Sequence, residues 1–237
     1  MFNTNFFDGK KMIRYMRSLP ITDKSENIYL DLKDPVAIMT HDDYFDRGMY
    51  EYEKENGFTS TFFLLTNQIK EKGFDSNADL QLHNDMSRKE WLETQIGEFK
   101  TNVKKMPMFN RNHRVFWRES HLDLANLAMH GIKADCSLLN SRPFKLCVQN
   151  RIIPIWEVPY TIVDEPYVDV TKNVYCTYNV SNKMEDLFVK GQTPLVALFH
   201  PYLKDKIYWK KFFEYAEKYG YKIMNLGDFY EKYLKKV

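Results

Sequence analysis

Residues 35–46 of the chain are PVAIMTHDDYFD, a stretch that joins an apolar run to a cluster of polar side chains. The apolar residues 36–40 predict a buried strand. His41, Asp42 and Asp43 follow directly, and like charges at the end of a buried strand are unfavourable unless a metal ion or a proton-transfer role compensates them. Residues 79–83, DLQLH, have the same form. We therefore expect buried strands that carry functional groups at their carboxyl ends.

Short apolar segments alternate with amphipathic segments along the whole chain. Repeated strand–helix units with apolar strands predict a parallel sheet covered by helices. Seven or eight such units would close as an α/β barrel, and an open doubly wound sheet is the alternative. The predicted strands are residues 36–40, 60–66, 79–83, 113–117, 134–139, 152–159, 195–200 and 221–226, and the predicted helices are 46–56, 87–103, 120–131 and the segment from Trp209 to Gly220.

The helix 87–103 has the clearest sequence signals. Ser87 and Glu90 have the spacing of a capping box, and Met86 and Trp91 have that of a hydrophobic staple. Apolar residues then recur at the period of one buried helix face as far as residue 103. We therefore expect Ser87 to cap this helix.

Length and composition limit the class of protein. The 237 residues are enough for one large domain, and the net charge of +2 gives no basic field for nucleic acid. Three cysteines without C-x-x-C spacing argue against a disulfide framework and a cysteine zinc site. The N-terminus has no apolar signal region, and no run is long enough to span a membrane, which predicts a cytoplasmic protein. Residues 1–33 are expected to pack as an N-terminal segment, without an assigned role, on a barrel of residues 34–237.

Polar residues fall repeatedly near the ends of predicted strands. Beyond residues 41–43, His83 ends one strand, Arg111 and His113 lie near the start of another, and His200 ends a fourth. Each has an ordinary alternative: a helix cap, a loop histidine, a surface cation or a strand-ending polar residue. Together they favour an active site, because the carboxyl ends of parallel barrel strands meet at one face.

These segments, in this order, resemble the polysaccharide deacetylases of the NodB type, the family 4 carbohydrate esterases. THDD at residues 40–43 resembles the first motif, Thr-Phe-Asp-Asp-Gly, and LH at 82–83 the start of the second, His-Ser/Thr-x-x-His. RNH at 111–113 resembles the Arg-x-Pro motif, GIKADCSL at 131–138 a common Gly-x-x-Tyr-Asp-Ser-Ser stretch, and LFHP at 198–201 the Leu-x-His motif. The resemblance implies an irregular (β/α)7 barrel as a single domain.

The resemblance also implies roles for single residues. Asp42 matches the catalytic base, and Asp43 and His83 match metal ligands. Arg111 matches the residue that positions the base, and His200 matches the general acid, with an oxyanion donor at the backbone near Arg114. The implied cofactor is a divalent metal, zinc first, with cobalt, manganese or nickel as alternatives. Such an ion polarises the carbonyl group and lowers the pKa of a bound water to about 7.

The sequence departs from the family pattern at the metal. The second histidine of the His-x-x-x-His motif is replaced by Ser87, whereas a catalytic zinc ion normally has three protein ligands. Another residue supplies the third ligand (Asp85 or His113 first, Asn84 or His41 next), or the ion is held by two protein ligands and water, or the metal and the activity are lost. Tyr44 stands where the family has glycine.

The expected activity is removal of an N-acetyl or O-acetyl group from a sugar. A cytoplasmic location favours a nucleotide- or lipid-linked precursor of a surface polysaccharide as substrate. Tyr44, Trp117 and Trp156 are the predicted substrate contacts, since aromatic side chains suit sugars. An inactive domain of the same fold that binds a glycan or a protein is the main alternative, and hydrolysis of a non-sugar amide is a third. The sequence leaves the oligomeric state open.

Overall fold

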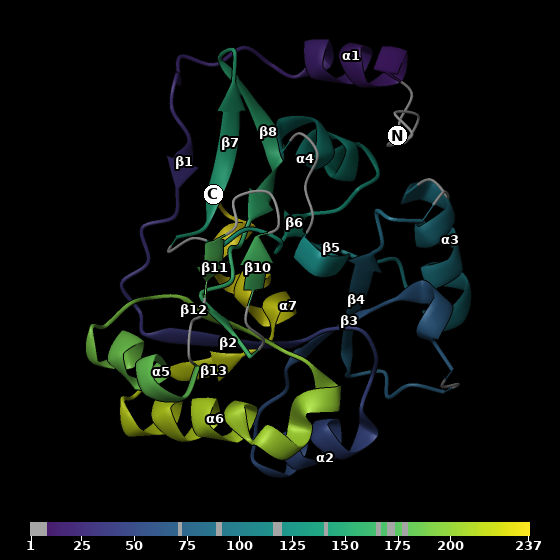
Figure 1. Ribbon diagram of the computed structural model, residues 1–237. Helices are drawn as coiled ribbons and strands as arrows, with labels where there is room; N and C mark the ends of the chain where they lie inside the picture. The colour runs from purple at the N-terminus through teal and green to yellow at the C-terminus, as the bar shows by residue number, and fades with distance from the viewer. Residues whose placement is uncertain are drawn as a thin grey trace.

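The structure, a computed structural model, describes residues 9–70, 73–88, 92–115, 120–139, 142–164, 167–169, 174–176 and 180–237. Its main sheet runs in the order β1-β7-β8-β6-β5-β4-β3-β2-β12-β9, with β13 also paired to β2 (Figure 1). Neighbours from β8 through β6 to β9 are parallel, and only β1–β7 and β7–β8 pair antiparallel within it. The sheet strands are β1 (Ile28–Tyr29), β2 (Val36–His41), β3 (Thr61–Leu64), β4 (Asp79–Asn84), β5 (Phe109–Asn112), β6 (Ala134–Asp135), β7 (Phe144–Val148), β8 (Arg151–Glu157), β9 (Ile162–Val163), β12 (Leu195–Phe199) and β13 (Lys222–Met224). A separate hairpin pairs β10 (Tyr167–Asp169) with β11 (Val174–Cys176).

The sheet closes irregularly. In the described part of the chain no strand ladder joins β8 to β12, and residues 158–163 cross between them instead. The amide of Val158 donates to Asp135, that of Tyr160 donates to Leu138, and that of Thr161 donates to Val196 on β12. This confirms the predicted irregular α/β barrel over the open doubly wound sheet.

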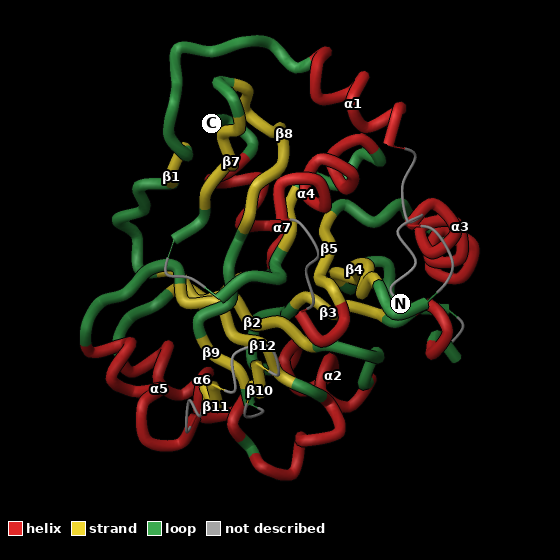
Figure 2. Tube along the Cα trace, turned by 45° about the horizontal axis from the view of Figure 1, so that its top comes forward, coloured by secondary structure: helices red, strands yellow, loops and turns green. Residues whose placement is uncertain are grey.

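Helices surround the strands (Figures 1 and 2). They are α1 (Gly9–Ser18), α2 (Arg47–Glu55), α3 (Leu92–Val103), α4 (Ser120–Met129), α5 (Val180–Val189), α6 (Tyr208–Lys218) and α7 (Leu226–Phe229). The side chain of Asp46 caps α2 through the amide of Met49, as an acidic residue before a helix can. No helix in the described part of the chain is long and apolar enough to cross a membrane.

Strand alternation divides the core into two layers. Ala37 and Met39 on β2 pack against the surrounding helices, whereas Val36 and Ile38 pack inside the barrel with Trp156. The C-terminal helical turn, Tyr230–Leu234, fills the amino end of the barrel. There the carbonyl group of Leu234 accepts a hydrogen bond from the indole of Trp156 at 3.2 Å. That end is therefore sealed by packing, and the polar residues lie at the other end.

The predicted strand at residues 113–117 is wrong. The strand is β5, Phe109–Asn112, and a 3-10 turn follows at His113–Val115; residues 116–119 are outside the described residues. β5 has the sequence FNRN, and all four residues are buried although three are polar. An apolar pattern could not reveal it, because its side chains are buried by hydrogen bonding. The antiparallel hairpin β7–β8 was also not predicted.

The N-terminal segment contacts the barrel at several places. Met12 of α1 is buried in the outer core layer, and β1 pairs with β7 through Ile28 and Tyr29. Ser87 does not cap α3 in the described residues: its hydroxyl donates to Asp85, and α3 begins at Leu92. Glu90 and Trp91, the other members of the predicted capping signals, lie outside the described residues.

Two acidic side chains are fully buried at the carboxyl ends of β6 and β8. Asp135 and Glu157 are paired in register and are 0% exposed. Burial raises the pKa of both carboxyl groups, and for Glu157 the neighbouring Asp135 raises the pKa further, so that it lies well above its ordinary value. Asp135 accepts hydrogen bonds from Asn110 and Ser137. The pair therefore retains a proton at a pH where unfolded carboxyl groups are ionised.

We predict that Glu157→Gln weakens the pH dependence of stability. With folded pKa values above the unfolded values of about 4, the folded state holds the extra proton, so the free energy of unfolding falls as pH rises above about 4, by up to about 1.4 kcal/mol per pH unit. Glutamine has the same shape and no titrating proton. The free energy of unfolding, measured with urea at pH 5 and at pH 8, should fall less between these two pH values for Glu157→Gln than for the wild type. The exposed Glu55→Gln should keep the wild-type loss, and an equal loss in all three proteins would contradict the prediction.

Candidate active site and metal centre

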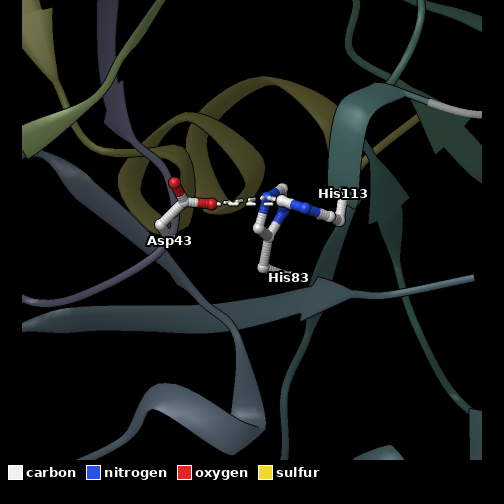
Figure 3. A group of neighbouring side chains, drawn as sticks. All are labelled: Asp43, His83 and His113. Atoms are coloured by element: carbon white, nitrogen blue, oxygen red, sulfur yellow. Dashed lines mark hydrogen bonds and ion pairs between the residues drawn. The ribbon is translucent and has the colours of Figure 1, made fainter. Parts of the chain in front are cut away.

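Three side chains from three segments converge at the carboxyl end of the barrel. Nε2 of His83 lies 3.4 Å from Oδ1 of Asp43, and Nδ1 of His113 lies 3.5 Å from the same oxygen. The two histidine nitrogens are 3.2 Å apart. Figure 3 shows both imidazoles directed at the Asp43 carboxylate. Among the described residues this is the one group of three such ligands.

The spacing of these atoms fits a metal ion. A tetrahedral zinc ion with bonds of about 2.0–2.2 Å holds its ligand atoms about 3.3–3.5 Å from one another. The three measured separations agree with those edges within about 0.1 Å. Oδ1 of Asp43 is also buried without a hydrogen bond in good geometry. A carboxylate and two imidazoles with one shared centre form a donor set suited to zinc.

The backbone around each ligand explains its orientation. Nδ1 of His83 lies 3.0 Å from the carbonyl oxygen of Arg111, which can only accept, so Nδ1 carries the proton and Nε2 has the lone pair directed to the site. Asp43 follows β2 in a left-handed conformation with φ of 77°. Burial acts to raise the pKa of Asp43, but the adjacent His113 and His83 outweigh it and hold that pKa well below the ordinary value.

Asp42 lies beside this group and is held by Arg111. Nη1 of Arg111 donates to Oδ1 of Asp42 at 2.7 Å and to the hydroxyl of Thr40 at 2.6 Å. The guanidinium is fully buried and lies over the ring of Phe63, with its carbon 4.5 Å from the ring centroid. Oδ2 of Asp42 is 3.8 Å from Nε2 of His83, so one carboxylate oxygen is fixed by Arg111 and the other faces the ligand group.

His200 forms a dyad with Asp164, a residue that the sequence analysis did not select. Nδ1 of His200 lies 2.7 Å from Oδ1 of Asp164, and the backbone amide of His200 donates to Oδ2 of the same carboxylate at 2.7 Å. Asp164 is buried and directly follows β9. The rule that selected Asp42 and His83, a polar residue after a short apolar strand, would also have found Asp164.

Two of the three other candidate ligands, Asp85 and His41, lie outside the group. The carboxylate of Asp85 accepts hydrogen bonds from the amide and hydroxyl of Ser87, which holds it in its own turn. His41 points to the helix side of β2, where Nε2 lies 2.6 Å from Glu53 at a fully buried position. Adjacent strand residues face opposite sides, so His41 and Asp42 could not both enter the barrel.

The predicted substrate contacts lie in different environments. Tyr44 is half-buried beside Asp43 and lines a cavity there. Trp156 is 2% exposed in the inner core, so it is a packing residue and not a substrate contact. Its strand position was predicted correctly, but the side chain points into the sealed interior. Trp117 lies outside the described residues. Arg114, near which the oxyanion donor was predicted, is exposed and has a left-handed backbone conformation with φ of 59°.

Solved structures with the same fold include family 4 carbohydrate esterases. A putative polysaccharide deacetylase from Mycobacterium smegmatis has a TM-score of 0.60 at 13% identity, covering 92% of this chain and 96% of that one. A family 4 carbohydrate esterase from Bacillus anthracis has a TM-score of 0.52 at 16% identity, covering 94% and 92%. The chain has the fold of the family 4 carbohydrate esterases.

That family fold also occurs without activity. A family 4 pseudoenzyme from Bacillus anthracis has a TM-score of 0.56 at 11% identity, covering 85% of this chain and 67% of that one. No protein-family profile matches the sequence. A search of curated proteins returned no match. At these identities the likeness establishes the fold alone.

We predict that His113→Ala lowers zinc affinity by at least about 100-fold, since it removes one of three ligands. Asp85→Asn and Ser87→Ala should leave the affinity within about threefold, because neither side chain belongs to the converging group. Zinc content by elemental analysis and competition with a chelating dye would measure this. Equal loss in Asp85→Asn and His113→Ala would contradict the ligand set.

Proposed function

We propose that the protein is a metal-dependent hydrolase that removes an N-acetyl or O-acetyl group from a sugar. In the amide case water adds to the carbonyl carbon, the C–N bond breaks, and acetate and the free amine result. The convergence of Asp43, His83 and His113, with Asp42 and His200 at the same rim, carries this proposal. The fold shared with family 4 carbohydrate esterases supports it.

Asp43, His83 and His113 would hold the metal. When bound, a zinc-class ion polarises the carbonyl group and lowers the pKa of an attacking water to about 7. His83 is supported for this role by the Arg111 carbonyl group, which fixes its tautomer. His113 takes the place that the family motif gives to the residue at position 87.

Asp42 is the proposed general base. The salt bridge to Arg111 immobilises one oxygen and leaves the other, 3.8 Å from Nε2 of His83, to accept a proton from water at the site. Thr40 shares the same Arg111 nitrogen, so the guanidinium cannot rotate without losing two hydrogen bonds. Arg111 is therefore a positioning residue.

His200 is the proposed general acid. With Nδ1 donating to Asp164, the ring is oriented so that Nε2 exchanges a proton with the departing nitrogen. Asp164 thus positions His200 as Arg111 positions Asp42.

A carbohydrate substrate is supported by an aromatic side chain at the rim. Tyr202 is 49% exposed, and its ring centroid lies 5.1 Å from that of His200. An exposed ring beside the proposed proton donor can stack on a sugar face. A cytoplasmic, nucleotide- or lipid-linked precursor of a surface polysaccharide remains the proposed substrate class, and it rests on sequence composition and the resemblance.

The alternative is an inactive domain that binds a glycan or a protein. The loss of the second motif histidine at Ser87 favours it, as does the occurrence of a pseudoenzyme with this fold. It predicts a protein purified without stoichiometric metal and without zinc uptake on titration. The three-ligand geometry favours the hydrolase.

We predict that Asp42→Asn and His200→Ala each lower acetate release from N-acetylated sugars by about 10²–10⁴-fold. The wild type would be assayed with added zinc or cobalt, and acetate would be measured by a coupled enzyme assay. Asp164→Asn should lower the rate less and shift the pH profile, since it acts through His200. Asp85→Asn is the matched control and should retain the wild-type rate. Absence of acetate release from every such substrate, with metal bound, would overturn the proposal.

A further inference from the structure

A cavity opens directly beside the proposed metal ligand Asp43. It has a volume of about 390 Å³ and is lined by Phe45, Leu64, Ile69 and Phe74 together with Asp43. The rings of Phe45 and Phe74 are in edge contact, with centroids 5.5 Å apart, and Phe45 also packs on Phe62 at 4.9 Å. The apolar wall is therefore held in place by the core behind it.

The position of this cavity relative to His200 identifies which part of a substrate enters it. The strands at the rim run β12, β2, β3, so His200 after β12 and Leu64 on β3 lie on opposite sides of Asp43 after β2. In the proposed reaction the departing nitrogen lies next to His200, which protonates it. The acyl substituent is bonded to the same carbonyl carbon and points away from the departing nitrogen. The cavity lies on that side, away from His200.

We propose that this cavity binds the acyl group of the substrate and that the site takes apolar acyl groups longer than acetyl. This rests on the proposed function and specifies its substrate class as an N-acyl sugar with a medium-length aliphatic or aromatic acyl group. The hydrolysis is the same: the C–N bond breaks, a C–O bond forms, and a longer carboxylate leaves with the free amine.

The lining distinguishes an acyl chain from a sugar ring. An acetyl methyl group is about the size of a water molecule, about 30 Å³, and would leave most of the cavity unfilled. A sugar ring would need several hydrogen-bond partners, and beyond Tyr44 the wall offers Gln68 and the exposed Lys70 at its edge. Four apolar side chains favour a chain of methylene groups or an aryl ring, because burying either group against them removes apolar surface from water and so favours binding.

The test uses hydroxamates, which bind zinc through two oxygens and carry the acyl substituent on the carbonyl carbon. Acetohydroxamate and hexanohydroxamate would be titrated into the zinc-loaded protein by calorimetry. We expect hexanohydroxamate to bind at least about tenfold more tightly, because its additional methylene groups enter the cavity. Ile69→Trp narrows the cavity and should abolish this preference by lowering the affinity for hexanohydroxamate.

The matched control is Ile223→Trp. Ile223 is likewise half-buried and lines a separate cavity near Gly57 and Lys222, at the amino end of β13. This variant should keep the tenfold preference. Equal affinity of the two hydroxamates in the wild type, with acetohydroxamate binding intact, would overturn the acyl-pocket proposal and leave the proposed function standing. Zinc-independent binding or no binding of both would overturn the metal site, on which both proposals depend.

Discussion

The buried guanidinium of Arg111 is the interaction on which the rest of the site depends. It donates from β5 to Thr40 on β2 and to Asp42 directly after β2, and its Nε donates to the carbonyl group of Cys136 after β6. A fully buried cation is costly unless it is paired and hydrogen-bonded, and these partners provide that compensation. One side chain therefore ties together three strands that are not all neighbours in the sheet. The proposed base is held in place by the same contacts that stabilise the barrel interior.

Strand alternation then decides which polar residues can act at the site. Thr40 on β2 and the following Asp42 face the barrel axis, whereas His41 faces the helices and contacts Glu53, which also accepts hydrogen bonds from Ser60. Asp43 enters the site because the chain turns there with φ of 77°. The three consecutive polar residues therefore have three different environments. His41 pairs with Glu53, Asp42 is held by Arg111, and Asp43 belongs to the ligand group.

Several of these features could be predicted from the sequence because they rest on local patterns. The apolar strands β2, β4 and β12 lie close to their predicted ranges, and the polar residues at their ends mark the correct end of the barrel. β5 could not be predicted, since its buried asparagines and Arg111 gain their partners only in the folded barrel. The burial of Trp156 is likewise a tertiary effect of the C-terminal turn. The choice between Asp85 and His113 also required the fold, because both follow buried strands and only backbone geometry separates them.

β5 and its turn couple the two halves of the proposed chemistry. Arg111 fixes Asp42 through its side chain and orients His83 through its carbonyl oxygen, and His113 follows two residues later at the start of the 3-10 turn. The motif that the sequence resembles has its second histidine four residues after the first, at the position of Ser87 in this chain. Here Ser87 is hydrogen-bonded to Asp85, and the second imidazole of the converging group comes from the 3-10 turn after the neighbouring strand β5. The base and the ligand group consequently share one rigid element, so a change in the β5 backbone would disturb proton transfer and metal binding together.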